Sequence, residues 1–150
     1  MHDHFSVRVE VRSYEVDANG HLNHAYYHRY GEHARTEHLR SNGATMDRLV
    51  AYGAGVVLLE THVRFLRELR HGDTVDIDSR ITFGEGKSFA MDHTLRRVGV
   101  DGAPDEVAAE IRGRLGLMDH ATRRLLADPG EMLGRIAAQA GTSRRPGPGE

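Results

Sequence analysis

The chain has 150 residues, of which 39% are hydrophobic and 28% are charged, and its formal net charge is −2. This length fits one folded domain, and the charge provides no basic field that would favour nucleic acid as a partner. Because there is no cysteine, disulfides, zinc–thiolate sites and cysteine nucleophiles are excluded. No apolar run approaches the roughly 20 residues of a membrane span, and the polar N-terminus shows no signal peptide, so we expect a cytoplasmic protein without membrane contact.

The first predicted elements are a strand, a turn and a long helix. Apolar and polar residues alternate over residues 5–11, which is the pattern of a half-buried strand. A turn follows over Asp17–Gly20. The next segment predicts a helix from residue 24 to about residue 42, with Asn23 as its N-cap and Gly43 ending it.

Beyond this helix the hydrophobic period changes to two. Alternation predicts strands over residues 57–65, 75–83, 89–95 and 107–117, with turns at 72–73, 84–86 and 99–104. Consecutive strands with short turns favour an antiparallel meander, to which residues 5–11 add a fifth strand. The long helix is then expected to cover the apolar face of that sheet.

The C-terminal part has a weaker pattern. Residues 119–139 contain a second helical segment, interrupted by Pro129-Gly130. Residues 141–150 have a composition typical of a disordered tail. We therefore expect one domain over residues 1–140.

Residues 14–30 are the most informative stretch, because Asp17 lies in a turn that leads directly into a helix start. A helix start offers unpaired backbone N–H groups and a partial positive charge. These groups can polarise a carbonyl oxygen while the carboxylate attacks its carbon or directs water at it. The pairing indicates an acyl-transferring hydrolase, although an aspartate in a turn also commonly bonds its own backbone.

Residues 17–27 resemble the signature of a known enzyme family. They run Asp-Ala-Asn-Gly-His-Leu-Asn-His-Ala-Tyr-Tyr, close to the Asp-x-x-Gly-His-Val-Asn-Asn-x-x-Tyr pattern of the 4-hydroxybenzoyl-CoA thioesterase-like acyl-CoA thioesterases. Further matches follow in order at residues 72–75, 86–88 and 109–119, so the resemblance spans about residues 5–129. It implies the hotdog fold, an α+β fold in which a five-stranded antiparallel sheet wraps around one long central helix.

The resemblance also implies an activity and an assembly. The activity is hydrolysis of an acyl-CoA or acyl-carrier-protein thioester to a free acid and a thiol, with no cofactor. In this fold the active sites resemble clefts between two subunits, which implies self-association as a dimer, or as a homotetramer that contains such dimers.

Two catalytic roles are carried over from the family. Its catalytic carboxylate corresponds to Asp17, and the backbone N–H that polarises the thioester carbonyl corresponds to that of His24. Asp17 would act as a nucleophile that forms a mixed anhydride or as a general base for water, and the sequence does not separate the two. Glu15 stands where many relatives have a second Asp, and His24 replaces their second Asn.

Other residues are candidates for substrate contact. Gly20 is expected to permit a backbone conformation that other residues resist, while letting the substrate approach closely. Asn19, His21 and Asn23 are expected mainly to hold the loop by hydrogen bonds. Tyr27 is a further candidate, although core packing also explains it. Glu60, like the nearby His62, could reach a neighbouring subunit's site or simply lie on a solvated or interface face of its strand, and Ser88 at the start of the fourth strand could touch the substrate.

Two sets of side chains are candidates for binding ionic ligands. The phosphates of CoA favour basic side chains at the mouth of the site, for which the candidates are Arg64, Arg67, Arg70, Lys87, Arg96 and Arg97. His24, His28 and Glu32 share one helical face, but there is no His-Glu-x-x-His pattern and no fixed third ligand, so we expect no metal.

Two other functions are compatible with parts of the pattern. Hotdog hydratases and dehydratases resemble an Asp-x-x-x-x-His dyad, whereas only three residues separate Asp17 from His21, which disfavours that chemistry. A non-catalytic acyl-binding module would tolerate replacement of Asp17 without consequence.

Overall fold

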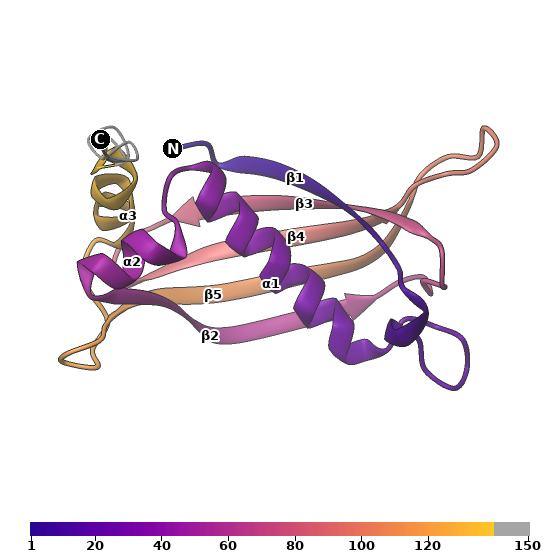
Figure 1. Cartoon of the computed structure of the whole chain (residues 1–150), viewed down its shortest axis with the longest axis horizontal. Coiled ribbons are helices and arrows are strands. Elements are labelled where there is room, and N and C mark those ends of the chain that lie inside the picture. The colour runs from indigo at the N-terminus through magenta and orange to yellow at the C-terminus, as the bar shows by residue number, and fades with distance from the viewer. Residues whose placement is uncertain (140–150) are drawn as a thin grey trace, which may run out of the picture.

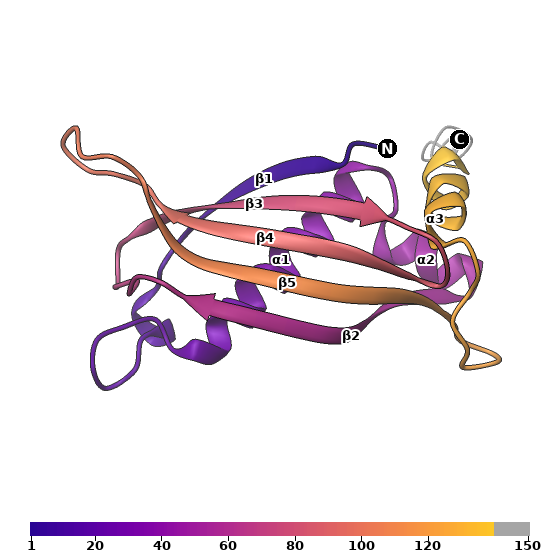
Figure 2. The same cartoon turned by 180° about the vertical axis from the view of Figure 1, so that it is seen from behind.

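Five strands form one antiparallel sheet in the computed structural model, which describes residues 1–139. The strands are β1 (His4–Glu10), β2 (Ala54–Phe65), β3 (Thr74–Phe83), β4 (Ser88–Arg97) and β5 (Glu106–Asp119). The long helix α1 (His24–Ser41) lies across one face of the sheet, as Figures 1 and 2 show from opposite sides. The predicted five-stranded antiparallel α+β architecture is confirmed. The predicted tail at residues 141–150 lies outside the described residues.

The order of the strands differs from the predicted meander. β3, β4 and β5 are consecutive neighbours and β1 pairs with β3, but β2 lies at the far edge and pairs with β5, giving the order β1-β3-β4-β5-β2. Ala54 lies opposite Asp119 and Phe65 opposite Ala109. The predicted pairing of the strand over residues 57–65 with the next strand was therefore wrong. Turn signals mark where a strand ends, but they do not determine which strand it joins.

α1 begins and ends where the sequence predicts. The Asn23 side chain accepts a hydrogen bond from the N–H of Ala25 at 3.0 Å, which caps the first turn. The helix ends at Ser41, and Gly43 then turns the chain with φ +93°, a conformation that favours glycine. A short 3-10 turn over Ser13–Glu15 precedes the helix.

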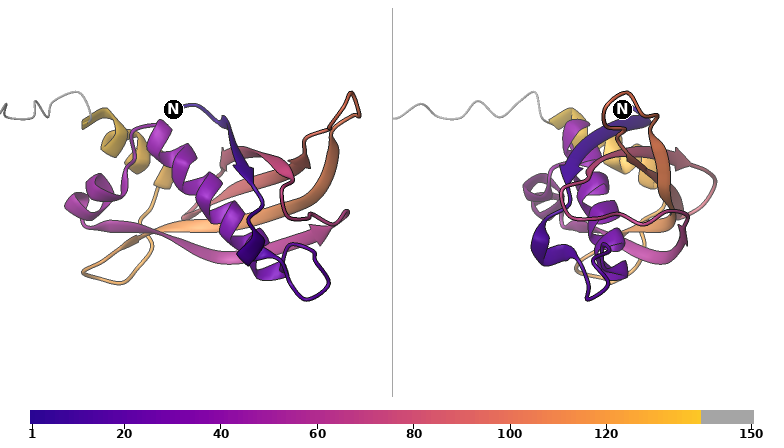
Figure 3. Two further views of the ribbon diagram at one scale, coloured as in Figure 1. Left: turned by 45° about the vertical axis from the view of Figure 1, so that its right-hand side comes forward. Right: turned by 90° about the vertical axis from the view of Figure 1, so that its right-hand side faces the viewer.

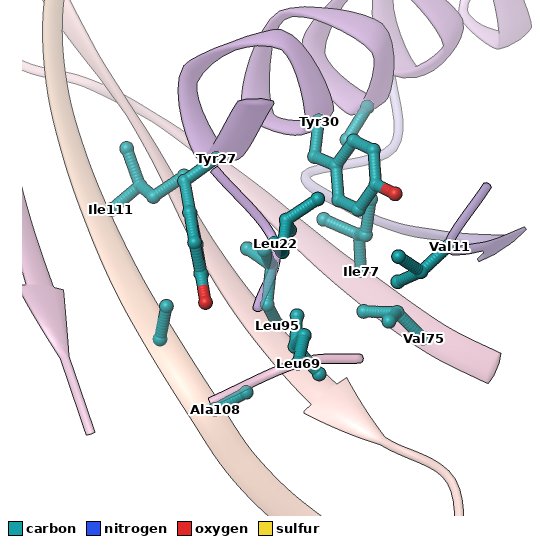
Figure 4. Close-up of a cluster of buried hydrophobic side chains, with 12 residues drawn as sticks. Val11, Leu22, Tyr27, Tyr30, Leu69, Val75, Ile77, Leu95, Ala108 and Ile111 are labelled. Atoms are coloured by element: carbon teal, nitrogen blue, oxygen red, sulfur yellow. The ribbon is translucent and has the colours of Figure 1, made fainter. Parts of the chain in front are cut away.

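One face of α1 packs on the sheet. Tyr27 and Tyr30 are buried, and Figure 4 shows both rings pointing from the helix into the cluster of side chains around Leu22 and Leu69. Gly31 lets the helix approach the sheet closely, because a Cβ atom there would lie 3.1 Å from the Ile111 side chain. Both tyrosines therefore contribute to the core.

Two shorter helices lie at the end of the sheet opposite the start of α1 (Figure 3). The first, α2 (Met46–Tyr52), was not predicted; Thr45 caps it, and Gly53 follows it with φ +85°. The second is α3 (Pro129–Ala138). The predicted interruption at Pro129-Gly130 was wrong, since Pro129 opens this helix, where its missing N–H costs no hydrogen bond.

The buried side chains form two separate clusters. One lies under the first half of α1 and includes Leu22, Tyr27 and Leu69. The other lies toward α2 and α3 and includes Leu49 and Leu133. The start of α1 and the α2 end of the molecule therefore rest on different parts of the core. None of the helices within residues 1–139 combines the length and the apolar character needed to cross a membrane.

Candidate active site

The segment before α1 is a closed loop that presents Asp17. A bridge between Val16 and Leu22 closes it, and the N–H of Asp17 donates to the carbonyl of His21 at 2.8 Å. Inside the loop the N–H of Gly20 donates to the carbonyl of Asp17 at 3.0 Å. Gly20 has φ +77°, so this tight turn needs the conformational freedom that the sequence predicts for it.

The Asp17 carboxylate is exposed and oriented by the loop itself. Its Oδ1 accepts hydrogen bonds from the N–H groups of Asn19, at 2.9 Å, and His21, at 3.2 Å. Among residues 1–139 no hydrogen-bond donor contacts Oδ2. The backbone thus fixes the carboxylate through one oxygen, and the other oxygen remains available to a substrate or a water molecule.

The first turn of α1 presents a backbone donor beside this loop. The N–H of Ala25 donates to the Asn23 side chain, and the N–H of Tyr26 donates to the Asn23 carbonyl at 2.9 Å. For the N–H of His24, no acceptor is found in the described part of the chain. This group carries the partial positive charge of a helix start and is suited to polarise a carbonyl oxygen.

A pocket of about 330 Å³ brings these groups together. Its lining includes Asp17, His21, His24 and Tyr27, together with residues 65–68, which comprise the last residue of β2 and the three residues after it. Tyr27 forms part of its wall and meets Phe65 edge to face, with ring centroids 4.9 Å apart. Burial raises the pKa of Tyr27 above its usual value, so its hydroxyl stays protonated at neutral pH.

A network of ionisable side chains, which the sequence pattern does not predict, borders the pocket. His21 Nε2 lies 2.7 Å from Glu68 Oε2, and Glu68 Oε1 accepts from the Arg70 guanidinium at 2.6 Å. The hydrogen bond from Arg70, with a smaller contribution from His21, lowers the pKa of Glu68. The His21 side chain therefore contacts the β2–β3 connection, while its backbone N–H holds Asp17. No local signal predicts such a contact between segments almost 50 residues apart.

Buried hydrogen bonds of Glu15 anchor the loop to α1. Its buried carboxylate Oε1 accepts hydrogen bonds from the Tyr30 hydroxyl and from the N–H of Arg12, both at 2.8 Å. Its carbonyl accepts the N–H of Asn23 at 2.9 Å. Glu15 therefore ties the chain just before Asp17 both to the cap of α1 and to its second turn.

Replacing Tyr30 with phenylalanine is expected to lower the free energy of unfolding by about 1.5–3 kcal/mol, because a buried carboxylate then loses a donor. Urea unfolding of the variant measures the loss. Tyr14→Phe is the matched control, since Tyr14 is 69% exposed and its hydroxyl makes no hydrogen bond among the described residues. If the two variants unfold at the same urea concentration, the Glu15–Tyr30 contact does not anchor the loop.

The other predicted substrate-binding residues lie outside this pocket within one chain. Asn19 and Gly20 form the tip of the loop, and Asn23 caps α1. Glu60 lies on the face of the sheet away from α1, where it pairs with Arg114 at 3.1 Å. Ser88 begins β4 opposite Gly116, toward the α2 end of the sheet. The structure does not bring Glu60 or Ser88 to Asp17 of the same chain.

Most of the predicted basic candidates have acidic partners. Arg64 pairs with Glu110 and Arg96 with Asp78, and the same holds for Arg70 with Glu68 and Arg97 with Glu106. Arg67 lines the Asp17 pocket, and no carboxylate pairs with it within residues 1–139. Within residues 1–139, the side chains of His24, His28 and Glu32 do not form a group that could hold a metal ion.

The chain is similar in sequence to known thioesterases. A model of the thioesterase-like superfamily matches residues 11–136. The acyl-acyl carrier protein thioesterase ATL3 of Arabidopsis thaliana chloroplasts is 33% identical over 95 residues, which are 63% of this chain and 50% of that protein. This chain thus spans about half the length of that relative.

Solved structures share the fold over nearly the whole chain. The 4-hydroxybenzoyl-CoA thioesterase from Pseudomonas sp. strain CBS-3 has a TM-score of 0.79 and 18% identity, covering 90% of this chain and 99% of that chain. A Staphylococcus aureus protein in complex with CoA has a TM-score of 0.76 and 22% identity, covering 98% and 90%. At these identities the likeness establishes the hotdog fold.

Proposed function

The chain belongs to the thioesterase-like superfamily, and on that basis we propose that it hydrolyses an acyl thioester to a free acid and a thiol, with Asp17 as the reacting carboxylate. One observation carries this proposal. The exposed carboxylate of Asp17 lines the same pocket as His24, the first residue of α1. No donor within the described residues contacts Oδ2 of this carboxylate. A nucleophile or base and an oxyanion donor are the two parts that acyl transfer needs.

Two routes are consistent with this arrangement. In the first, Asp17 attacks the thioester carbonyl carbon, the thiolate leaves with the electrons of the C–S bond, and water then cleaves the mixed anhydride. In the second, Asp17 takes a proton from water as the water oxygen attacks the same carbon, and the thiolate leaves. In both, the N–H of His24 stabilises the negative charge that develops on the carbonyl oxygen.

The relatives support a thioester on a phosphopantetheine arm as the substrate. The Arabidopsis relative is named as an acyl-acyl carrier protein thioesterase, and the Staphylococcus structure contains CoA. We propose that this chain accepts one or both carriers, with Arg67 available to a phosphate at the mouth of the pocket. Asn19, Gly20, His21 and Asn23 would keep the loop in place, and Tyr27 would shape the pocket.

We also propose that the chain acts as a dimer, built through β2. This 12-residue strand forms an edge of the sheet, and such an edge exposes unpaired backbone groups. Four exposed apolar side chains, Leu58, Leu59, Phe65 and Leu66, lie on it or directly after it. A homotetramer would join two such dimers. Mass measurement in solution tests the proposal, and a monomer would contradict it.

The activity is tested with a panel of acyl-CoA and acyl-carrier-protein thioesters, with the released thiol detected by a chromogenic trap. We expect at least one carrier class to be turned over well above its spontaneous hydrolysis. Comparing the same acyl group on the two carriers identifies the preferred one. If the purified protein binds the thioesters but hydrolyses none of them, it is an acyl-binding module and the proposed activity is wrong.

A further inference from the structure

The loop over residues 17–22 is docked on the segment that connects β2 to β3. His21 and Arg70 form an isolated antiparallel bridge, and the N–H of Leu22 donates to the carbonyl of Leu69 at 2.6 Å. Leu22 and Leu69 are both buried, and their side chains lie in the cluster shown in Figure 4. The end of the loop therefore rests on a fixed part of the core.

The backbone of His21 is bonded to Asp17 at two points. The carbonyl of His21 accepts the N–H of Asp17 at 2.8 Å, and the N–H of His21 donates to Asp17 Oδ1 at 3.2 Å. The second bond is at the long end of the usual range for N–H···O bonds, so a small shift of His21 would break it. Asn19 would then be the single donor left to this carboxylate within residues 1–139. The orientation of the Asp17 carboxylate thus depends on where His21 is held.

Glu68 holds His21 through its imidazole ring. Nε2 of His21 lies 2.7 Å from Oε2 of Glu68. The other oxygen, Oε1, accepts from the Arg70 guanidinium, at 2.6 Å from Nη2 and 3.1 Å from Nε. Each oxygen of Glu68 therefore has its own partner, and the bonds from Arg70 leave Oε2 to His21. Arg70 is fixed in turn, because its backbone N–H donates to Asp73 Oδ2 at 2.8 Å.

This network is suited to fix geometry and contributes little to folding. The side chains of His21, Glu68 and Arg70 are 36%, 44% and 60% exposed. Exposed ion pairs add little to the free energy of unfolding, because water screens them and two side chains lose freedom. The rate of a reaction at a bound carbonyl, by contrast, falls steeply when the reacting group is misplaced. The network should therefore affect the rate more than the stability.

We infer that Glu68 is a positioning residue for the reaction at Asp17: it holds His21, and His21 holds the Asp17 carboxylate with Oδ2 free for the thioester or for water. This inference rests on the proposed thioesterase function. Glu68 acts through His21 and not through the substrate, although it lies in the lining of the same pocket. The β2–β3 connection thereby becomes part of the reacting unit.

Steady-state kinetics of Glu68→Ala with the best thioester of the panel test this role. We expect kcat to fall about tenfold, while KM changes less than about twofold and the urea midpoint stays at the wild-type value. Glu131→Ala is the matched control, because Glu131 is an exposed carboxylate that pairs with Arg135 at 2.8 Å on α3, outside the Asp17 pocket. The control should keep the wild-type kcat. An unchanged kcat in Glu68→Ala, or a raised KM at unchanged kcat, overturns the inference.

A double-variant cycle separates positioning through His21 from a direct effect of Glu68. His21→Ala removes the imidazole, and the variant that combines it with Glu68→Ala should be no slower than the slower single variant, because both changes break the same connection. His21→Gln keeps a side-chain N–H that can donate to Glu68 and should retain most of the wild-type kcat. Losses that multiply in the double variant mean that the two side chains act independently, which overturns the inference.

Hydrogen exchange of the His21 backbone N–H provides a readout that does not depend on turnover. We expect it to be about threefold or more faster in Glu68→Ala than in wild type, and unchanged in Glu131→Ala. Unchanged exchange in Glu68→Ala overturns the inference.

The failure of this inference can be told apart from failure of the proposed function. If the wild type hydrolyses a thioester, Asp17→Asn is inactive and Glu68→Ala keeps the wild-type kcat, the positioning role alone is wrong. If the wild type hydrolyses no thioester, both are wrong.

Discussion

Replacing Asp17 with asparagine is expected to lower kcat for thioester hydrolysis by about 10²–10⁴-fold, the usual contribution of a positioned carboxylate acting as base. Asparagine keeps an oxygen that can accept the N–H bonds of Asn19 and His21, so the loop should retain its shape. It lacks the negative charge needed to attack a carbonyl or to take a proton from water. KM should change much less than kcat, because the rest of the pocket is untouched.

Steady-state kinetics with the best substrate of the panel provide the measurement. Asp101→Asn is the matched control: Asp101 is exposed in the β4–β5 connection and adopts φ +54°, a conformation that asparagine also accepts. Circular dichroism and the urea midpoint establish that both variants are folded. Full activity in Asp17→Asn would show that the carboxylate is not the reacting group. Asp17 would then have only a structural role in its loop.

Stability is expected to fall steeply in mild acid because of His93. This β4 side chain is buried against α1, and neither ring nitrogen has a hydrogen-bond partner within the described residues. Burial, with smaller contributions from the charges of Arg35 and His38, lowers the pKa of His93 from 6.5 to about 4. The folded protein therefore holds His93 neutral, whereas the unfolded chain protonates it near its ordinary pKa.

The sign of the effect follows from this difference. Above pH 6.5 both states are neutral at His93 and its contribution to stability is fully present. As the pH falls from 6.5 to 4 the unfolded chain binds a proton that the folded state does not, so about 3 kcal/mol is lost by pH 4. The pKa of buried His38 is lowered too, mainly by burial, and adds to the loss in the same direction.

Urea unfolding of wild type and His93→Leu between pH 7.5 and pH 4 measures this loss. The leucine variant should show a clearly shallower decline, because one of the groups that bind protons only on unfolding is gone. His71→Gln removes an exposed histidine and serves as the control for the loss of one histidine from the sequence. Parallel pH profiles for wild type and His93→Leu would mean that His93 titrates alike in both states.

The local features of the fold could be predicted from the sequence, and the pairing of β2 could not. The Asn23 cap, the extent of α1 and the alternating strands each depend on residues that are neighbours in the chain. The position of β2 depends on its contacts with β5, about 50 residues further on. The short helix α2 was missed, although Thr45 and Gly53 are ordinary signals for its two ends.

In the candidate site too, the local features could be predicted from the sequence and the contacts between distant segments could not. Asp17, Gly20 and Asn23 lie on one short segment, and the structure places them in a loop and a helix cap as their residue types predict. The contact between His21 and Glu68 joins distant segments through side chains alone, and no periodicity in the sequence encodes it. Glu60 and Ser88 lie away from Asp17 in one chain, and only an assembly of subunits would give them access to it.

The two hydrophobic clusters have a consequence for how such a protein changes over time. Because Leu22 and Tyr27 support the loop end while Leu49 and Leu133 support the α2 end, the destabilising effects of substitutions at the two ends should add rather than interact. A lineage can then vary the residues of α2 one at a time without eroding the support of the Asp17 loop. The same independence lets an engineer randomise α2 as a library while the Asp17 loop stays constant.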